Sequence, residues 1–157
     1  MITSENIDKI AAALAKFQAD VKNPKKSKEV KVQPREGRSY TYTYTPLEDI
    51  ISDIKEPMEK NGLSFFQSVG SAAGATTAPF VVTRLLHSSG QWIESDVLIV
   101  PAANNKAQEI GSAITYARRY QLSGMLGIAS DDDDDANAAN DNVATIIPKT
   151  KPAPAKP

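Results

Sequence analysis

The 157-residue sequence contains no cysteine, a single histidine and a single tryptophan. Without cysteine it can form neither a disulfide framework nor a thiolate metal site. His87 has no second histidine with which to share a metal ion or a catalytic triad. We therefore expect no metal, no cofactor and no enzymatic activity.

Long apolar runs are also missing, since the longest ones, such as residues 97–100, are far too short to span a bilayer. The amino terminus lacks the basic-then-apolar pattern of a signal peptide. No Gly-x-x-x-x-Gly-Lys-Ser/Thr loop is present to hold ATP phosphates. These absences predict a soluble, cytoplasmic protein that has no membrane partner and does not use ATP.

The formal net charge of −1 conceals a segregation of charge along the chain. Residues 1–130 carry 15 Lys and Arg against 13 Asp and Glu, whereas residues 131–157 carry three Lys against six Asp. Residues 22–38 alone hold seven basic residues against Glu29 and Glu36. Local patches of this kind, rather than the total, set the field that a ligand meets.

Hydrophobic residues make up 41% of the chain, which is enough for the core of one domain. Apolar spacing predicts helices over residues 4–21, from Pro46 to about Asn61 and over residues 105–123. Alternation predicts strands over residues 37–45, 63–69, 79–87 and 91–100. This order indicates an α+β fold, with an antiparallel sheet of three to four strands and helices packed on one side.

Residues 1–130 are expected to form this domain, and residues 131–157 an acidic and then Pro- and Ala-rich disordered tail.

Two helix ends are also predicted. Thr45 with Glu48 has the pattern of a capping box at the start of the second helix, and Gly124 is expected to stop the last helix.

The basic residues of the loop expected at 22–36, and just beyond it, are the first candidates for a binding site. Clustered cations suit a polyanion because each phosphate contact releases condensed counterions. A solvated loop that keeps the chain in solution is the alternative reading. The phosphate candidates of this region are Lys25, Lys26, Lys28, Arg35 and Arg38.

Aromatic rings and a helical arginine complete the set of candidates. Tyr40 and Tyr42 share a strand face with Tyr44 and could stack on bases, although such rings also pack under helices. Arg119 extends the polar line of Ser112 and Thr115 on the last helix and is a further phosphate candidate, with structural ion pairing as the alternative.

The aspartates at 131–135 are five consecutive carboxylates. A metal site needs ligands that converge from several directions, which a flexible run does not supply. A metal-dependent nuclease is therefore disfavoured. The run is interpreted as a hydrated spacer, or as a competitor for the basic groove.

Several motifs together resemble the ERF family of phage recombination proteins. The strongest match is the helix Gln108-x-x-Gly111-Ser112-Ala113-x-Thr115-Tyr116-x-Arg118-Arg119-Tyr120, followed by Gly127-Ile128 and the aspartates. Weaker matches in the same order are Tyr42-x-Tyr44 with Pro46-Leu47-x-Asp49-Ile50, then Gly62-Leu63, then His87-Ser-Ser-Gly90-Gln-Trp92. The likeness covers about residues 5–135.

The resemblance implies a β-β-β-α annealing core and an ATP-independent recombinase in the cytoplasm of an infected or lysogenic bacterium. Such proteins coat single-stranded DNA as a homo-oligomer, either a ring or a helical filament, and anneal complementary strands. A single-strand-binding protein or an exonuclease of phage or host is a further partner that this implies. A passive single-stranded DNA-binding protein without annealing activity is the alternative.

Overall fold

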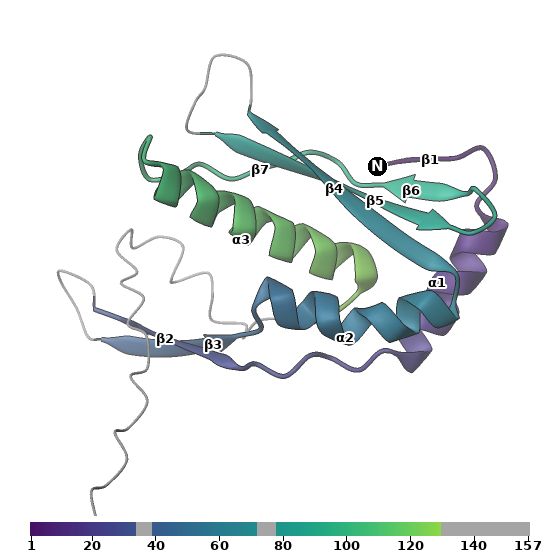
Figure 1. Cartoon of the computed structure of the whole chain (residues 1–157), viewed down its shortest axis with the longest axis horizontal. Coiled ribbons are helices and arrows are strands. Elements are labelled where there is room, and N and C mark those ends of the chain that lie inside the picture. Colours follow the sequence, from purple (N-terminus) through teal and green to yellow (C-terminus); the bar gives the residue numbers. More distant parts are fainter. Residues whose placement is uncertain (34–38, 72–77, 130–157) are drawn as a thin grey trace, which may run out of the picture.

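The computed structural model describes residues 1–33, 39–71 and 78–129, which form an α+β fold as expected (Figure 1). The elements follow one another as β1 (Ile2–Thr3), α1 (Asp8–Asp20), β2 (Lys28–Val32), β3 (Tyr40–Tyr44), α2 (Leu47–Lys60), β4 (Leu63–Ser71), β5 (Pro79–His87), β6 (Trp92–Glu94), β7 (Leu98–Ile99) and α3 (Ala107–Leu126). Within these ranges, no helix combines the length and the apolar character that a membrane-spanning segment needs.

The main sheet is antiparallel, with strand order β1-β6-β5-β4, and β7 also pairs with β5. It therefore has five strands rather than three or four. The single strand expected over residues 91–100 is divided into β6 and β7. Between them, the Ser95 N–H donates to the Thr83 carbonyl at 2.9 Å, and the Ser95 hydroxyl accepts from the Thr83 N–H at 3.0 Å. Contact with β5 thus continues where regular pairing stops.

The helices lie together on one side of this sheet, as the sequence predicts (Figure 1). They bury one continuous apolar cluster between themselves and the strands β4 and β5. Its members are Ile10, Ala13, Phe17, Ile50, Ile54, Met58, Leu63, Leu85, Leu122, Leu126 and Ile128. Burial of these side chains is the main stabilising contribution to the domain.

A buried polar network fixes α3 against the sheet. The Gln121 amide donates to the carbonyls of Val81 at 3.1 Å and Asp96 at 2.8 Å, and its oxygen accepts from the Thr83 hydroxyl at 2.7 Å. Gln67 on β4 also reaches Thr83 at 2.9 Å. Gln121 and Gln67 share the Thr83 hydroxyl, so these hydrogen bonds depend on one another. Sliding α3 along the sheet would therefore break several buried hydrogen bonds together.

α3 ends at Leu126, three residues beyond the last residue of the predicted helix over 105–123. The helix runs through Gly124, and its C-cap is Gly127, which has a left-handed backbone with φ of 69°. There the Ile128 N–H donates to the Ser123 carbonyl at 3.0 Å. The prediction chose the wrong glycine because the burial of Leu126 and Ile128, which requires the extra turn, is a tertiary effect.

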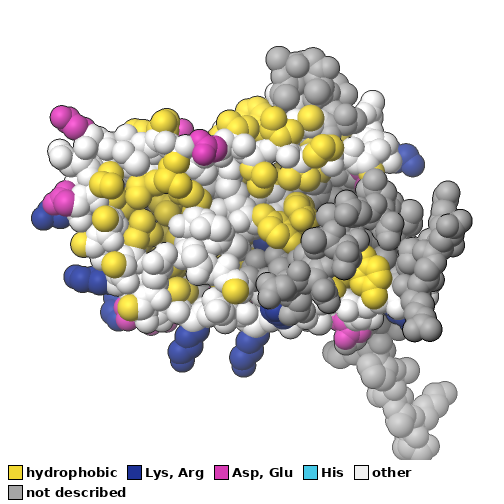
Figure 2. All heavy atoms as spheres, turned by 180° about the vertical axis from the view of Figure 1, so that it is seen from behind, with side chains coloured by type: hydrophobic (Ala, Val, Ile, Leu, Met, Phe, Trp, Pro, Cys, Tyr) yellow, Lys and Arg dark blue, Asp and Glu magenta, His cyan; other side chains and the backbone are white. Residues whose placement is uncertain are grey.

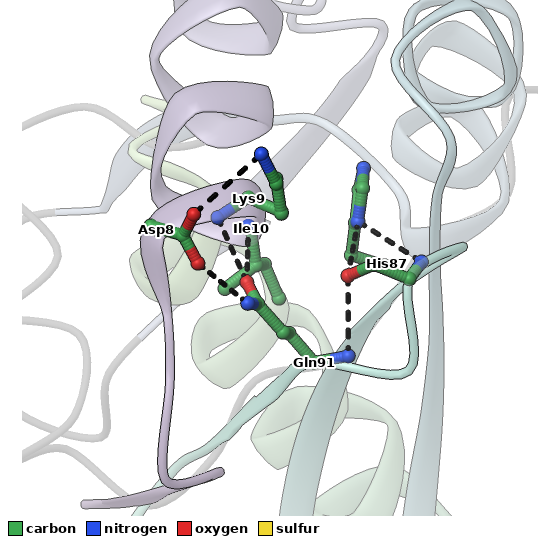
Figure 3. Close-up of polar contacts among 6 residues, drawn as sticks. Asp8, Lys9, Ile10, His87 and Gln91 are labelled. Atoms are coloured by element: carbon green, nitrogen blue, oxygen red, sulfur yellow. Dashed lines mark hydrogen bonds and ion pairs between the residues drawn. The ribbon is translucent and has the colours of Figure 1, made fainter.

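The start of α1 is capped by a residue from a distant hairpin rather than by its own sequence (Figure 3). The side-chain oxygen of Gln91 accepts from the N–H groups of Lys9 at 2.8 Å and Ile10 at 2.9 Å. Its amide nitrogen donates to the Asp8 carboxylate at 2.7 Å. In this way the turn between β5 and β6 is bound to the first turn of α1.

Candidate nucleic-acid interface

A second, two-stranded sheet contains most of the predicted site. β2 and β3 pair antiparallel, with Lys28 opposite Tyr44 and Val30 opposite Tyr42. The prediction of a loop over residues 22–36 is thus wrong for residues 28–32, which form β2. The tyrosines of β3 share a face with Lys28 and Val30, because directly opposed residues of paired strands point to the same side. Val30 is buried, so this face is turned toward the rest of the molecule.

The tyrosine face meets α3 in a tyrosine–arginine cluster formed by Tyr42, Tyr44, Tyr116, Arg119 and Tyr120. The Arg119 guanidinium carbon lies 4.2 Å from the Tyr44 ring centre, 4.9 Å from that of Tyr120 and 5.6 Å from that of Tyr116. These distances are those of cation–π contacts. One cation therefore connects rings from two elements that are far apart in the sequence.

The rings of the cluster also contact one another. Tyr116 and Tyr120, one helical turn apart on α3, have ring centres 4.2 Å apart. On β3 the Tyr42 and Tyr44 rings lie 6.1 Å apart. Tyr116 is the most open member, with 41% of its surface exposed. Its side chain is thus partly open to solvent, while its ring contacts the Tyr120 ring and the Arg119 guanidinium.

Arg119 lies at the centre of this cluster and is only 8% exposed. The sequence predicted it as a phosphate contact on the same polar line as Ser112 and Thr115. Those two residues are exposed, whereas Arg119 is enclosed. The geometry is that of a residue that positions tyrosines, and direct phosphate contact stays a prediction.

The lysines of residues 22–28 are exposed, but the backbone that carries them is anchored. Pro24 is buried, and its carbonyl accepts from the buried Thr45 hydroxyl at 3.5 Å. The Ser27 hydroxyl donates to the Asp49 carboxylate in the first turn of α2. Lys22, Lys25, Lys26 and Lys28, which we call the lysine segment, therefore project from a fixed base rather than from a free loop.

Thr45 does not have the role that its sequence predicts. The residue before α2 that takes the N-cap position is Pro46, and no side chain caps the helix there. The Thr45 side chain is fully buried and points to Pro24 instead. The expected capping box with Glu48 is therefore wrong, because the hydroxyl is used to hold the lysine segment.

The remaining candidates divide between described and undescribed parts of the chain. Tyr40 and Tyr42 lie on β3 and are half-buried. Arg35 and Arg38 fall outside the residues that the structure describes. Arg118, next to the cluster, donates its Nε–H to the Gln67 side chain at 3.0 Å and so binds α3 to β4. The structure thus brings Lys28, Tyr42 and Arg119 together and adds three tyrosines to them.

Tyr44, Tyr116 and Tyr120 were not among the predicted site residues. One signal was visible: the spacing of four between Tyr116 and Tyr120 predicts adjacent rings on a helix. The contact between Tyr44 and Arg119 spans most of the domain in sequence and has no local signal.

The face of the main sheet turned away from the helices carries a second notable surface. Arg84 on β5 stacks over the Trp92 ring at 4.4 Å and the Phe66 ring at 5.6 Å, and its guanidinium pairs with Glu94 at 2.6 Å. Phe66 is 46% exposed and Ile99 is 50% exposed. In Figure 2 hydrophobic side chains gather in the upper half of the molecule, where the sheet lies in Figure 1.

Several Lys and Arg side chains of that view lie away from this apolar area. Lys and Arg project from the lower edge of Figure 2, the edge along which the chain runs from α1 to β2 in Figure 1. The apolar surface of the sheet and the cationic edge therefore occupy different parts of the molecule.

The groups with clearly shifted pKa values belong to the ends of α1 and α2. A hydrogen bond and ion pair with Lys60, at 2.8 Å, lowers the pKa of Asp20 and raises the pKa of Lys60. The hydrogen bond from Gln91 lowers the pKa of Asp8. Each shift has a structural cause that connects one element to another.

Comparison with known proteins agrees with the motifs described above. The model of the ERF superfamily matches residues 10–156, which is nearly the whole chain. No curated protein and no solved structure matches the chain significantly. The match confirms the resemblance carried by the α3 motif and its flanking segments. The chain belongs to the ERF superfamily.

Proposed function

We propose that this protein is a phage recombinase that binds single-stranded DNA as a homo-oligomer and anneals complementary strands without ATP. The observation that carries the proposal is the meeting of the anchored lysine segment with the tyrosine–arginine cluster at the β2–β3 hairpin. Lys28 and Tyr44, directly opposed on β2 and β3, join the two. Cations beside stackable rings are the combination with which proteins hold single strands.

In this proposal the phosphates follow the lysine segment, while a base stacks on the open face of Tyr116. Phosphate contacts carry no sequence information, and every base offers a π face. Binding is therefore independent of sequence, as annealing of arbitrary complementary strands requires. Pairing edges of the bound bases stay accessible to a second strand, and duplex formation supplies the driving force.

Two features of the main sheet support self-association. β4 pairs only with β5 among the described strands, so its outer edge offers unpaired N–H and C=O groups. The sheet face away from the helices carries exposed apolar side chains, including Phe66 and Ile99. Edges and apolar faces of this kind are commonly covered by another copy of the chain. Neither surface includes the lysine segment, which stays available for DNA.

Binding is tested by the salt dependence of affinity for an oligo-dT strand, measured by fluorescence anisotropy. The logarithm of affinity should fall with the logarithm of salt concentration, with a slope of about −0.7 per phosphate contacted. The double variant Lys25→Ala/Lys26→Ala should lower the size of this slope by about 1.4. Lys9→Ala/Lys16→Ala on α1 is the matched control and should leave it unchanged. Binding that ignores salt would exclude a phosphate site.

Annealing is tested separately, with two complementary labelled oligonucleotides and no ATP. The protein should raise the pairing rate above the protein-free rate, and light scattering should show an assembly on the single strand. Tight binding without acceleration would leave the passive single-stranded DNA-binding protein as the function. A monomer that never assembles on DNA would contradict the oligomer.

A further inference from the structure

The chain leaves the described domain beside the lysine segment. Ile128 is buried at 6% exposure in the core cluster, and the Ala129 N–H donates to the Asn23 side-chain oxygen at 3.2 Å. Asn23 directly follows Lys22 and precedes Lys25 by two residues. The point at which the tail begins is therefore fixed next to these lysines.

Five aspartates follow almost immediately. Asp131 is two residues beyond Ala129 and Asp135 is six residues beyond it. An extended chain advances about 3.3–3.6 Å per residue, so these carboxylates can lie within roughly 7–22 Å of Ala129. Lys22, Lys25 and Lys26 are all within three residues of Asn23. No long linker has to be ordered for the two charge clusters to meet.

We propose that the aspartates at 131–135 bind the lysine segment of their own chain and compete with single-stranded DNA for it. The inference rests on the proposed function for its DNA part and on the Ala129–Asn23 contact for its docking part. Carboxylates would occupy the places of phosphates, because both are anions that accept hydrogen bonds from ammonium groups.

The strength of such a contact suits a competitor rather than a permanent partner. Ion pairs between exposed side chains are individually weak and are screened by salt. A short tether nevertheless keeps the carboxylates at a high effective concentration near the lysines. A single strand that contacts many subunits of an assembly at once would displace the aspartates, whereas a short or weakly bound polyanion would not.

The docking part can be tested without DNA, by a carbodiimide that joins carboxylates and amines in direct contact. At low salt, mass spectrometry should find amide crosslinks between the aspartates and Lys22, Lys25 or Lys26, and these should disappear at high salt. Lys9 and Lys16 provide the control. Crosslinks no more frequent than those of the control lysines would overturn the inference. A mixture of isotope-labelled and unlabelled protein tells contacts within a chain from contacts between chains, and crosslinks confined to mixed pairs would overturn the assignment to the same chain.

The competition part is tested by changing all five aspartates to asparagine. Affinity for oligo-dT at low salt should rise about three- to tenfold, because the lysines lose their competitor. In a Lys22→Ala/Lys25→Ala/Lys26→Ala background the same five changes should give no such gain. An equal gain in both backgrounds would mean that the aspartates act only through net charge, and would overturn the inference.

The two experiments separate this inference from the proposed function. Crosslinks in a protein that binds no single-stranded DNA, with or without the aspartates, would support the docking and refute the proposed function. Binding of DNA with neither crosslinks nor a gain on neutralisation would refute the inference alone.

Discussion

At the scale of single residues, Arg119 determines how the candidate interface is interpreted. Its guanidinium contacts the rings of Tyr44, Tyr116 and Tyr120 and is almost completely enclosed. Arg119→Ala should lower the free energy of unfolding by about 1–3 kcal/mol, because it removes a desolvated cation from three rings and leaves a cavity. Urea unfolding measures this loss. Arg119→Lys should lower the free energy of unfolding by a smaller amount, since an ammonium group lacks the flat surface that stacks on rings.

The same variants show whether Arg119 positions tyrosines or contacts DNA itself. A positioning role predicts that Arg119→Ala weakens oligo-dT binding while the slope of affinity against salt stays unchanged. A direct phosphate contact predicts a slope smaller by about 0.7. An Ala variant with unchanged unfolding free energy and a smaller slope would overturn the positioning role.

Tyr116 is the residue of the cluster with the most open ring. Tyr116→Ala should weaken oligo-dT binding by about 1–3 kcal/mol, the contribution of stacking one base on an aromatic ring. Tyr116→Phe keeps the ring and should bind as well as the original protein. Anisotropy titrations of both variants at one salt concentration provide the measurement. If the Ala and Phe variants bind equally well, no base stacks there.

The sequence could predict the residue types of the interface but not their arrangement. Alternation placed Tyr40 and Tyr42 on one strand face, and the basic run singled out Lys25, Lys26 and Lys28. The contact of Tyr44 with Arg119 depends on how the β2–β3 hairpin packs against α3, which is a long-range property. For the same reason the burial of Arg119 could not be seen from its helical spacing.

At the scale of elements, α1 depends on a residue far away in the sequence for its first turn. Gln91 accepts from the N–H groups of Lys9 and Ile10 (Figure 3). Gln91→Ala should therefore lower the free energy of unfolding by about 0.5–2 kcal/mol, as the loss of a helix cap does. Gln108→Ala, in the exposed first turn of α3, is the matched control and should have little effect. Equal urea midpoints for the two variants would show that the cap does not stabilise the fold.

The elements themselves were predictable where their pattern is local. The amphipathic helices and the strands β4 and β5 follow from apolar spacing and from alternation, as expected. β2 was not predicted, because its lysines and Glu29 make residues 28–32 look like part of the basic loop. Their role as a strand becomes clear only from their pairing with β3. Residues 28–32 thus form a strand because of their partner rather than because of their own propensity.

At the scale of the whole molecule, the two surfaces on which the proposed function depends are separate. The anchored lysines and the tyrosine–arginine cluster lie at the β2–β3 hairpin, whereas the open strand edge and apolar face belong to the main sheet. Subunits could therefore assemble through the sheet without covering the proposed DNA site. This separation follows from the topology, in which the hairpin lies between β1 and β4 in the chain but forms a sheet of its own.

The ion pair between Asp20 and Lys60 connects the ends of α1 and α2, and gives the stability of the molecule a defined pH dependence. The pKa of Asp20 is lowered below its ordinary value of 3.8, first by the hydrogen bond from Lys60 and then by its charge. The unfolded chain then binds more protons than the folded one near and below pH 3.8, so stability falls as the pH drops through this range. Asp8, whose pKa Gln91 lowers, acts in the same direction.

Lys60 affects stability at alkaline pH. Its pKa is raised above the ordinary value of 10.5 by Asp20, so its contribution is present below pH 10.5 and is lost as the pH rises further. The urea midpoint of the original protein should accordingly fall both below about pH 4 and above about pH 10.5, with a plateau between them.

Asp20→Asn should lower the plateau slightly and make both declines shallower, because it removes the pair while keeping the shape of the side chain. Ser52→Ala, an exposed change elsewhere on α2, should leave the profile as it is. Profiles for Asp20→Asn and the original protein that are parallel at every pH would show that the pair contributes nothing to the fold.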